Sequence, residues 1–319
     1  MHVLFRQTVT TLVVLLAAGA LGAADGVGLS VVLEARAAAQ RGQDLLLTQQ
    51  RADGSWAGDP ATTAQVLICL ENAPDPAGEA RRSAVIVSAV AYLRRTVAAP
   101  PLAADALAAV LMALARDGIA AHRDLLASGR ARLLGCARSL DLPEGRRGLA
   151  FAASPDGPPD PWVTCAGLDG LLVTSGLEPA WTRAEYAALT AYLRANVPAV
   201  ASGQAALAAA RVRALLCLGV SPADPDVAGP LASLAQSPPR DPAAAFALAE
   251  ALSLARADNG PLAGWRERVI EALLDAQQGD GGWSAASGAG SRDGATALAL
   301  RAIQVAAGRQ LADAESALP

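Results

Sequence analysis

The sequence predicts an all-α protein built from repeated helix pairs, and three observations support this fold class. The 319 residues form a series of Ala- and Leu-rich stretches of helical length, with no convincing alternating pattern of a β-strand. Amphipathic stretches alternate with stretches that are apolar on every side, as expected for an outer and an inner helix layer. Similar segments of the form Gln-x-x-Asp-Gly-x-Trp stand near both ends. We expect a single domain over residues 25–319.

The first segment has the pattern of an export signal. Arg6 precedes an uncharged apolar stretch at 9–21, and small residues follow up to Ala24. The stretch is short for a membrane span, which needs about 20 apolar residues. We therefore predict a signal peptide over residues 1–24 and an exported protein, periplasmic or secreted. An uncleaved N-terminal anchor is the alternative, and only then would the protein contact a membrane.

Twelve helices follow in strict alternation. The amphipathic stretches carry most of the Arg and Glu and predict outer helices at about 35–50, 79–97, 123–140, 182–196, 225–236 and 264–278. The apolar stretches predict inner helices at about 61–73, 102–116, 160–176, 202–218, 241–257 and 292–307. The inner helices recur every roughly 40 to 60 residues, which indicates a repeat protein. Such pairs can stack as an open solenoid or close into a ring.

Several inner helices are predicted to begin at an Asp-Pro pair. The pairs begin at Asp59, Asp160 and Asp241, and Asp293-Gly294 is a variant. Asp is a preferred N-cap, and Pro suits the first helical position because it has no N–H to leave unpaired. An acidic ring at the mouth of a cavity is the alternative. We favour capping.

The two Gln–Trp segments align without a gap, each where an outer helix gives way to an inner one. Their matching residues are Gln50, Asp53, Gly54 and Trp56 in the first copy and Gln277, Asp280, Gly281 and Trp283 in the second. Asp-Gly supplies the positive φ that a tight reversal needs. We expect the amide to serve exposed carbonyls of the preceding helix end, beside a buried indole.

These segments resemble the QW repeat of the terpenoid cyclase and protein prenyltransferase superfamily, in particular the squalene-hopene-cyclase-like αα-toroids. A third, degraded copy resembles the same repeat at Gly148, Phe151, Pro155, Gly157, Asp160 and Thr164. The resemblance implies an (α/α)6 toroid, with inner helices around a central cavity and outer helices antiparallel to them. In such a ring the first and last helices meet, so Trp56 and Trp283 should be neighbours around the barrel.

The motifs that give this superfamily its activities are not found at the matching positions of this sequence. Squalene-type cyclases use an Asp-x-Asp-Asp acid, and this chain has no Asp-Asp pair. Only Trp162 and Phe246 are aromatic residues on predicted inner helices, which would stabilise carbocations poorly. The prenyltransferase zinc site needs Asp, Cys and His, and His122 is the one His after the signal. We expect no metal and no cofactor.

The four cysteines are flanked by apolar residues and are expected to be small buried core residues. In an exported chain a disulfide is the alternative. Cys136 and Cys165 would stand at similar heights on neighbouring antiparallel helices, so they form the candidate pair.

Charged residues on the predicted inner helices are Asp105, Asp169, Glu250, Arg211, Arg213 and Arg301. A buried charge is costly unless it is paired, so these side chains either reach helix ends and outer-layer partners or form a sparse polar lining of the cavity. We expect Trp162, Cys165, Asp169, Arg211 and Phe246 at the ligand cavity. Asp105 and Asp169 are weak candidates for a catalytic acid.

Two functions are compatible with these residues. The favoured hypothesis is a non-catalytic toroid that binds an apolar, lipid-like or isoprenoid-like molecule or a protein partner. The alternative is a terpenoid cyclase or prenyltransferase-like enzyme with an unrecognised acid. A net charge of -4 and a pI near 5.3, without a basic cluster, argue against nucleic acid as a partner.

Overall fold

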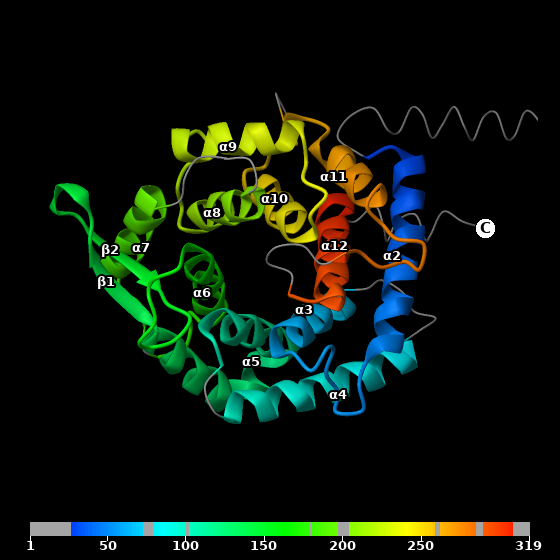
Figure 1. Ribbon diagram of the computed structural model, residues 1–319, viewed down its shortest axis with the longest axis horizontal. Coiled ribbons are helices and arrows are strands. Elements are labelled where there is room, and N and C mark those ends of the chain that lie inside the picture. The colour runs from blue at the N-terminus through cyan, green and yellow to red at the C-terminus, as the bar shows by residue number, and fades with distance from the viewer. Residues whose placement is uncertain are drawn as a thin grey trace, which may run out of the picture.

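The computed structural model is an (α/α)6 toroid (Figure 1). It describes residues 27–72, 79–99, 102–178, 180–196, 204–258, 262–284 and 290–308. The outer layer contains α2 (Leu29–Gln49), α4 (Glu79–Ala98), the second half of α5 (Ala104–Gly135), α7 (Arg183–Asn196), α9 (Pro225–Gln236) and α11 (Trp265–Leu274). The inner layer contains α3 (Pro60–Glu71), the first half of α5, α6 (Pro161–Val173), α8 (Ala205–Cys217), α10 (Pro242–Leu254) and α12 (Arg292–Ala307).

The helix pairs close into a ring. The last inner helix, α12, packs against α3 and α2, and the last outer helix, α11, also packs against α2. Figure 1 shows the blue helix α2 and the red helix α12 side by side at this seam. An open solenoid would leave these helices apart, so the toroid is the correct alternative.

The helix α5 supplies two of the twelve predicted helices. Its φ and ψ at Gly118 are 145° and 112°, which are not helical values. The inner and the outer predicted helices at 102–116 and 123–140 therefore follow each other through a break at one residue instead of a loop. Glycine tolerates this backbone conformation because it has no Cβ.

A β-hairpin corrects the prediction of an outer helix over 123–140 and adds strands to a chain expected to have none. The helix ends at Gly135, and β1 (Ala137–Asp141) pairs antiparallel with β2 (Arg147–Phe151) through the 3-10 turn η1 (Pro143–Gly145). The hairpin projects outward beside α7 (Figure 1). Its strands have five residues each, and a run this short shows no clear period.

The predicted helix caps form at three of four positions. The side chains of Asp59, Asp160 and Asp241 each accept a hydrogen bond from a backbone N–H of the first turn, and proline follows each of them. At α12 the N-cap is Ser291, whose hydroxyl accepts from a backbone N–H, so the prediction for Asp293 was wrong. A serine hydroxyl is as good a cap as a carboxylate, and capping at Ser291 begins the helix two residues earlier than capping at Asp293 would.

The two tryptophans of the repeat occupy equivalent buried positions. Trp56 Nε1 donates to the Leu46 carbonyl at 2.8 Å, and Trp283 Nε1 donates to the Leu273 carbonyl at 2.8 Å. Both indoles are fully buried. Each ring therefore pairs a carbonyl near the C-terminus of the outer helix that precedes it, which would otherwise be an unpaired buried acceptor.

The glutamines join neighbouring outer helices. Gln50 Nε2 donates to the Val85 carbonyl of α4 at 2.9 Å, and Gln277 Nε2 donates to the Ala38 carbonyl of α2 at 2.9 Å. Each also donates to the carbonyl of the turn glycine. We predicted that the amide serves the preceding helix end, and this was wrong, because the indole fills that role. The Gln277 bond links the last outer helix to the first.

The third copy of the repeat keeps the same geometry without a tryptophan. Phe151 N donates to Thr164 Oγ1 at 2.9 Å, as Trp56 N donates to Thr63 Oγ1 at 3.0 Å. The same bond joins Trp283 to an inner-helix threonine at 3.1 Å. Phe151 is fully buried in the tryptophan position. The structure thus confirms a third, divergent repeat.

The cysteines do not pair. All four are free, and Cys136 and Cys165 are both buried. Cys136 is the C-cap residue of α5, directly before β1, whereas Cys165 lines the central cavity. The disulfide that we considered for this pair is not formed.

The predicted signal peptide, residues 1–24, lies outside the described residues. Among the helices of the described ranges, none is both long enough and apolar enough to span a bilayer.

Candidate functional site

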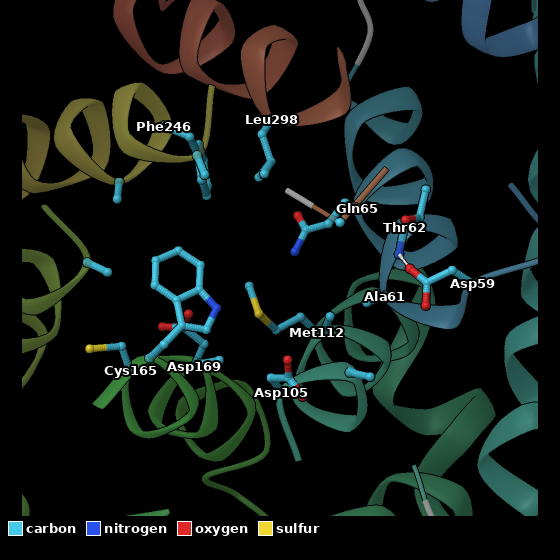
Figure 2. Close-up of a pocket in the computed structure, with 18 of the residues that line it drawn as sticks. Asp59, Ala61, Thr62, Gln65, Asp105, Met112, Cys165, Asp169, Phe246 and Leu298 are labelled. Atoms are coloured by element: carbon cyan, nitrogen blue, oxygen red, sulfur yellow. Dashed lines mark hydrogen bonds between the residues drawn. The ribbon is translucent and has the colours of Figure 1, made fainter. Parts of the chain in front are cut away.

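A cavity of about 640 Å³ lies inside the ring of inner helices. All six inner segments contribute residues to its wall, and Figure 2 shows side chains from several of them pointing into one space. Alanines form much of the wall: Ala61, Ala106, Ala109, Ala166, Ala210 and Ala247. Larger side chains at these positions would fill the centre of the ring. Because an alanine side chain ends at Cβ, the centre stays open here.

An ion-paired cluster forms one side of the cavity. Arg213 Nη1 donates to Glu250 Oε2 at 2.6 Å, and its Nη2 donates to Asp169 Oδ2. The side chains of Arg213 and Asp169 are 11% and 14% exposed, so water screens them little. Two carboxylates on one guanidinium leave this cluster with a negative formal charge.

The pKa values in the cluster reflect burial and pairing. Burial raises the pKa of Asp169, and the Arg213 guanidinium opposes that rise. Burial alone would lower the pKa of Arg213, but Asp169 and Glu250 outweigh it and raise the pKa well above its usual range. Arg213 therefore stays protonated.

A second guanidinium lies beside the cluster. Arg301 donates to Gln65 Oε1, and its guanidinium carbon stands 4.0 Å above the centre of the Phe246 ring. Burial lowers the pKa of Arg301, and Glu250 opposes that fall. The Phe246 face is thus covered by a cation of the protein itself.

Asp105 is different from the other carboxylates of the cavity. It lies in the first turn of α5 and lines the wall, and Figure 2 shows its carboxyl group directed into the space. No side chain or backbone group in the described ranges bonds to it. The cavity therefore holds one acidic group that has no partner in the described part of the chain.

Four of the five predicted cavity residues line the wall: Trp162, Cys165, Asp169 and Phe246. Arg211 does not, which corrects its placement. Arg211 is buried against the outer layer, where its Nε donates to the Leu193 carbonyl at 3.1 Å and its Nη2 lies 3.5 Å from Asp226 Oδ1. Consecutive helix residues differ by about 100° in direction, so Arg211 and Arg213 face opposite sides of α8.

Sequence reasoning did not place Gln65 or Met112 at the wall, and it chose Arg211 for the cavity although Arg213 was among the charged inner-helix candidates. Gln65 directly precedes the apolar run from Val66 to Leu70 in a mostly buried helix, and a polar residue there is a usable signal. Met112 carries no such signal, because an apolar side chain suits a core as well as a cavity.

The described residues contain no group of three or more metal-ligating side chains in reach of one ion. Cys165 is the one cavity thiol among them, and burial raises its pKa to about 12. A thiol, not a thiolate, therefore faces the cavity at neutral pH. His122 lies elsewhere, with its Nε2 2.6 Å from Asp117 Oδ2.

The arrangement of this chain matches a solved enzyme structure. The apo form of a variant of the type II terpene cyclase MstE from Scytonema is similar over 88% of this chain and 99% of its own, with a TM-score of 0.59 and 16% sequence identity. The chain has the fold of a terpenoid cyclase αα-toroid. No family model and no curated protein sequence matches the chain.

The toroid fold by itself does not assign cyclase activity to this chain. A structural match at 16% sequence identity shows a shared scaffold alone, while function depends on the groups placed in the cavity. In this toroid those groups are an ion-paired cluster, an Asp105 carboxylate without a partner among the described residues, and a wall rich in alanine.

A second group of titratable side chains lies at the other end of α3. Glu71 ends this helix, and its Oε2 is 3.7 Å from Arg116 Nε. Burial and the nearby Asp117 raise the pKa of Glu71 to about 7, and Arg116 opposes that rise. Glu71 therefore titrates near neutral pH, away from the cavity.

Replacing Glu71 by Gln is expected to stabilise the protein at alkaline pH. Because the folded-state pKa of about 7 lies above the usual 4.5, the stability from this group is complete below 4.5 and is lost as the pH rises through 7. The Gln variant should gain about 1–3 kcal/mol of unfolding free energy at about pH 8 and little at about pH 4.5. Urea unfolding at both pH values measures this. Glu144→Gln, at an exposed ion pair, should show no pH-dependent gain, and equal curves for Glu71→Gln and wild type would contradict the prediction.

Proposed function

We propose that the protein is a non-catalytic toroid that holds one apolar small molecule, lipid-like or isoprenoid-like, in its central cavity. The cavity itself is the observation that carries this proposal. Its volume of about 640 Å³ falls within the range of small-molecule sites, about 300–1,000 Å³. Its wall is mainly apolar with a few convergent polar groups, which is the usual composition of such sites.

The carboxyl groups of the cavity support binding over cyclase chemistry. A type II cyclase acid must be protonated to attack an alkene, and a neighbouring carboxylate favours that state. Burial raises the pKa of Asp169, and its hydrogen bond to Arg213 opposes that rise by favouring the ionised form. Asp105 has no second carboxylate beside it in the sequence. Neither residue belongs to an Asp-x-Asp-Asp motif, whose neighbouring carboxylates keep the acid of a squalene-type cyclase protonated.

An exported protein with this cavity would act in the periplasm or outside the cell. An apolar molecule is poorly soluble there, and the apolar wall of the cavity would shield it from water. A protein partner at the rim is the other binding function that the fold permits.

Native mass spectrometry of the purified full chain, followed by solvent extraction, tests the proposal. We expect one apolar molecule per chain, either retained from the host or taken up from added lipid. Ala106→Phe and Ala166→Phe fill the cavity and should lower its occupancy at least about fivefold, as expected when bulk replaces open space. The control is Ala91→Phe on the exposed face of α4, which should leave occupancy unchanged.

Three results would overturn the proposal. An empty cavity that takes up no added lipid would exclude small-molecule binding and direct attention to a protein partner. Equal occupancy in the filled variants and wild type would place the ligand elsewhere. Recovery of an added polyprene in chemically altered form, abolished by Asp105→Asn, would show that the protein is an enzyme.

A further inference from the structure

We infer that the cavity selects apolar molecules that carry a protonated amine, with the Asp105 carboxylate as the counter-ion of that amine. This inference rests on the proposed function and names the chemical class of its ligand. Three features of the wall support it: unpaired acceptors, an excess of negative charge, and an aromatic ring without a partner.

Hydrogen-bond acceptors at the cavity outnumber the charged donors that could serve them. Asp105 has no bonding partner in the described part of the chain, and Asp169 uses Oδ2 for Arg213 while its Oδ1 bonds to none of the described residues. Arg213, the charged donor of the wall, is committed to two carboxylates. A ligand that donates hydrogen bonds would fill this deficit, and an ammonium group offers three donors.

The charge of the wall points the same way. The residues lining the cavity include three carboxylates, Asp59, Asp105 and Asp169, and one guanidinium, Arg213. Adding the adjacent Glu250 and Arg301 gives four carboxylates against two guanidinium groups. A cavity with this charge balance attracts a cation and repels a carboxylate or a phosphate.

Trp162 supplies a surface suited to an organic cation. Its ring lines the cavity and has no ring or cation contact among the described residues, whereas the Phe246 face is covered by Arg301. An ammonium group over an indole gains cation–π attraction, most of all where water is excluded. Alanines, Met112 and Leu298 provide the apolar wall for the rest of the ligand.

A matched series of ligands on the full chain tests the inference. Decylamine, 1-decanol and decanoate share one alkyl length and differ in the charge of the head group. Titration at about pH 7, followed by intrinsic tryptophan fluorescence and by native mass spectrometry, should give a Kd for the amine at least about tenfold below that of the alcohol. Decanoate should bind more weakly than the alcohol.

The substitution Asp105→Asn tests the role of the carboxylate as counter-ion without changing the size of the cavity. In this variant the amine Kd should rise to within about threefold of the alcohol Kd, and the alcohol Kd should not change, because the loss is one charge contact. Asp156→Asn, at an exposed loop position, is the control and should keep the full preference. Unfolding curves verify that both variants are folded.

The outcomes distinguish this inference from the proposed function. If the alcohol binds as tightly as the amine, the charge preference is wrong and the apolar site stands. If none of the three ligands binds, the proposed function itself fails. If folded Asp105→Asn keeps the tenfold preference, Asp105 is not the counter-ion.

Discussion

Replacing Trp283 by Ala is expected to lower the free energy of unfolding by about 3–5 kcal/mol, the cost of removing a large buried aromatic side chain. The indole is fully buried, and its N–H pairs the Leu273 carbonyl. Its ring also packs closely against Gly42 of α2, where an added Cβ would lie 3.0 Å from the indole. The residue thus fills the seam at which the last helices meet the first. Chemical denaturation followed by circular dichroism measures the loss.

The substitution Trp283→Phe separates the contribution of ring packing from that of the indole hydrogen bond. Phe151 fills the equivalent position at the third repeat, so a phenyl ring can occupy this kind of junction. This variant leaves the Leu273 carbonyl without its donor and should cost about 1–3 kcal/mol, less than alanine. A Trp283→Ala protein that unfolds at the wild-type denaturant concentration would show that the indole does not stabilise the seam.

Arg213→Ala is the second change with a large expected effect. It leaves Asp169, which is largely buried, and Glu250, which is partly exposed, without a counter-ion at hydrogen-bonding distance. Breaking a buried ion pair by removing one partner typically costs about 3–5 kcal/mol of unfolding free energy. The matched control is Arg240→Ala, because Arg240 pairs with Asp275 on the surface with 70% and 64% exposure. That variant should lose less than about 1 kcal/mol.

The deficit of Arg213→Ala should depend on pH. Burial already raises the pKa of Asp169, and removing Arg213 takes away the group that opposes the rise. A carboxyl group with a raised folded-state pKa contributes stability that is present at low pH and lost as the pH rises through that pKa. The difference from wild type should therefore be smaller at about pH 5 than at about pH 7.5. A deficit that is the same at both pH values would assign the loss to packing instead of charge.

The order and layer of the helices could be predicted from the sequence because each depends on local patterns. Asp59 and Asp160 cap helices as their neighbours imply, and the Gln–Trp turns stand at outer-to-inner junctions. These patterns involve residues close together in the chain. Closure of the ring was suggested by the resemblance, and the contacts of α12 with α2 and α3 show it.

The predictions that were wrong concern features that depend on contacts between distant segments. The inner helices are apolar on all sides, so the sequence pattern does not indicate which side of α8 faces the cavity. Arg211 was therefore chosen where Arg213 is correct. The role of Gln277 depends on Ala38, 239 positions away, and no local pattern reveals such a partner. The hairpin was missed because Ala137–Asp141 continues the composition of the helix before it.

The bond from Gln277 to Ala38 also bears on the order in which the protein folds. An open array of repeats has two free ends, and it can lose its terminal units one at a time. A closed ring has no terminal unit, because every helix pair has a neighbour on each side. The seam joins residues 239 positions apart, so its contacts carry a greater loop-closure entropy than those within a repeat. We therefore expect adjacent pairs to assemble first and the seam to close last, after which no edge remains from which the structure can fray.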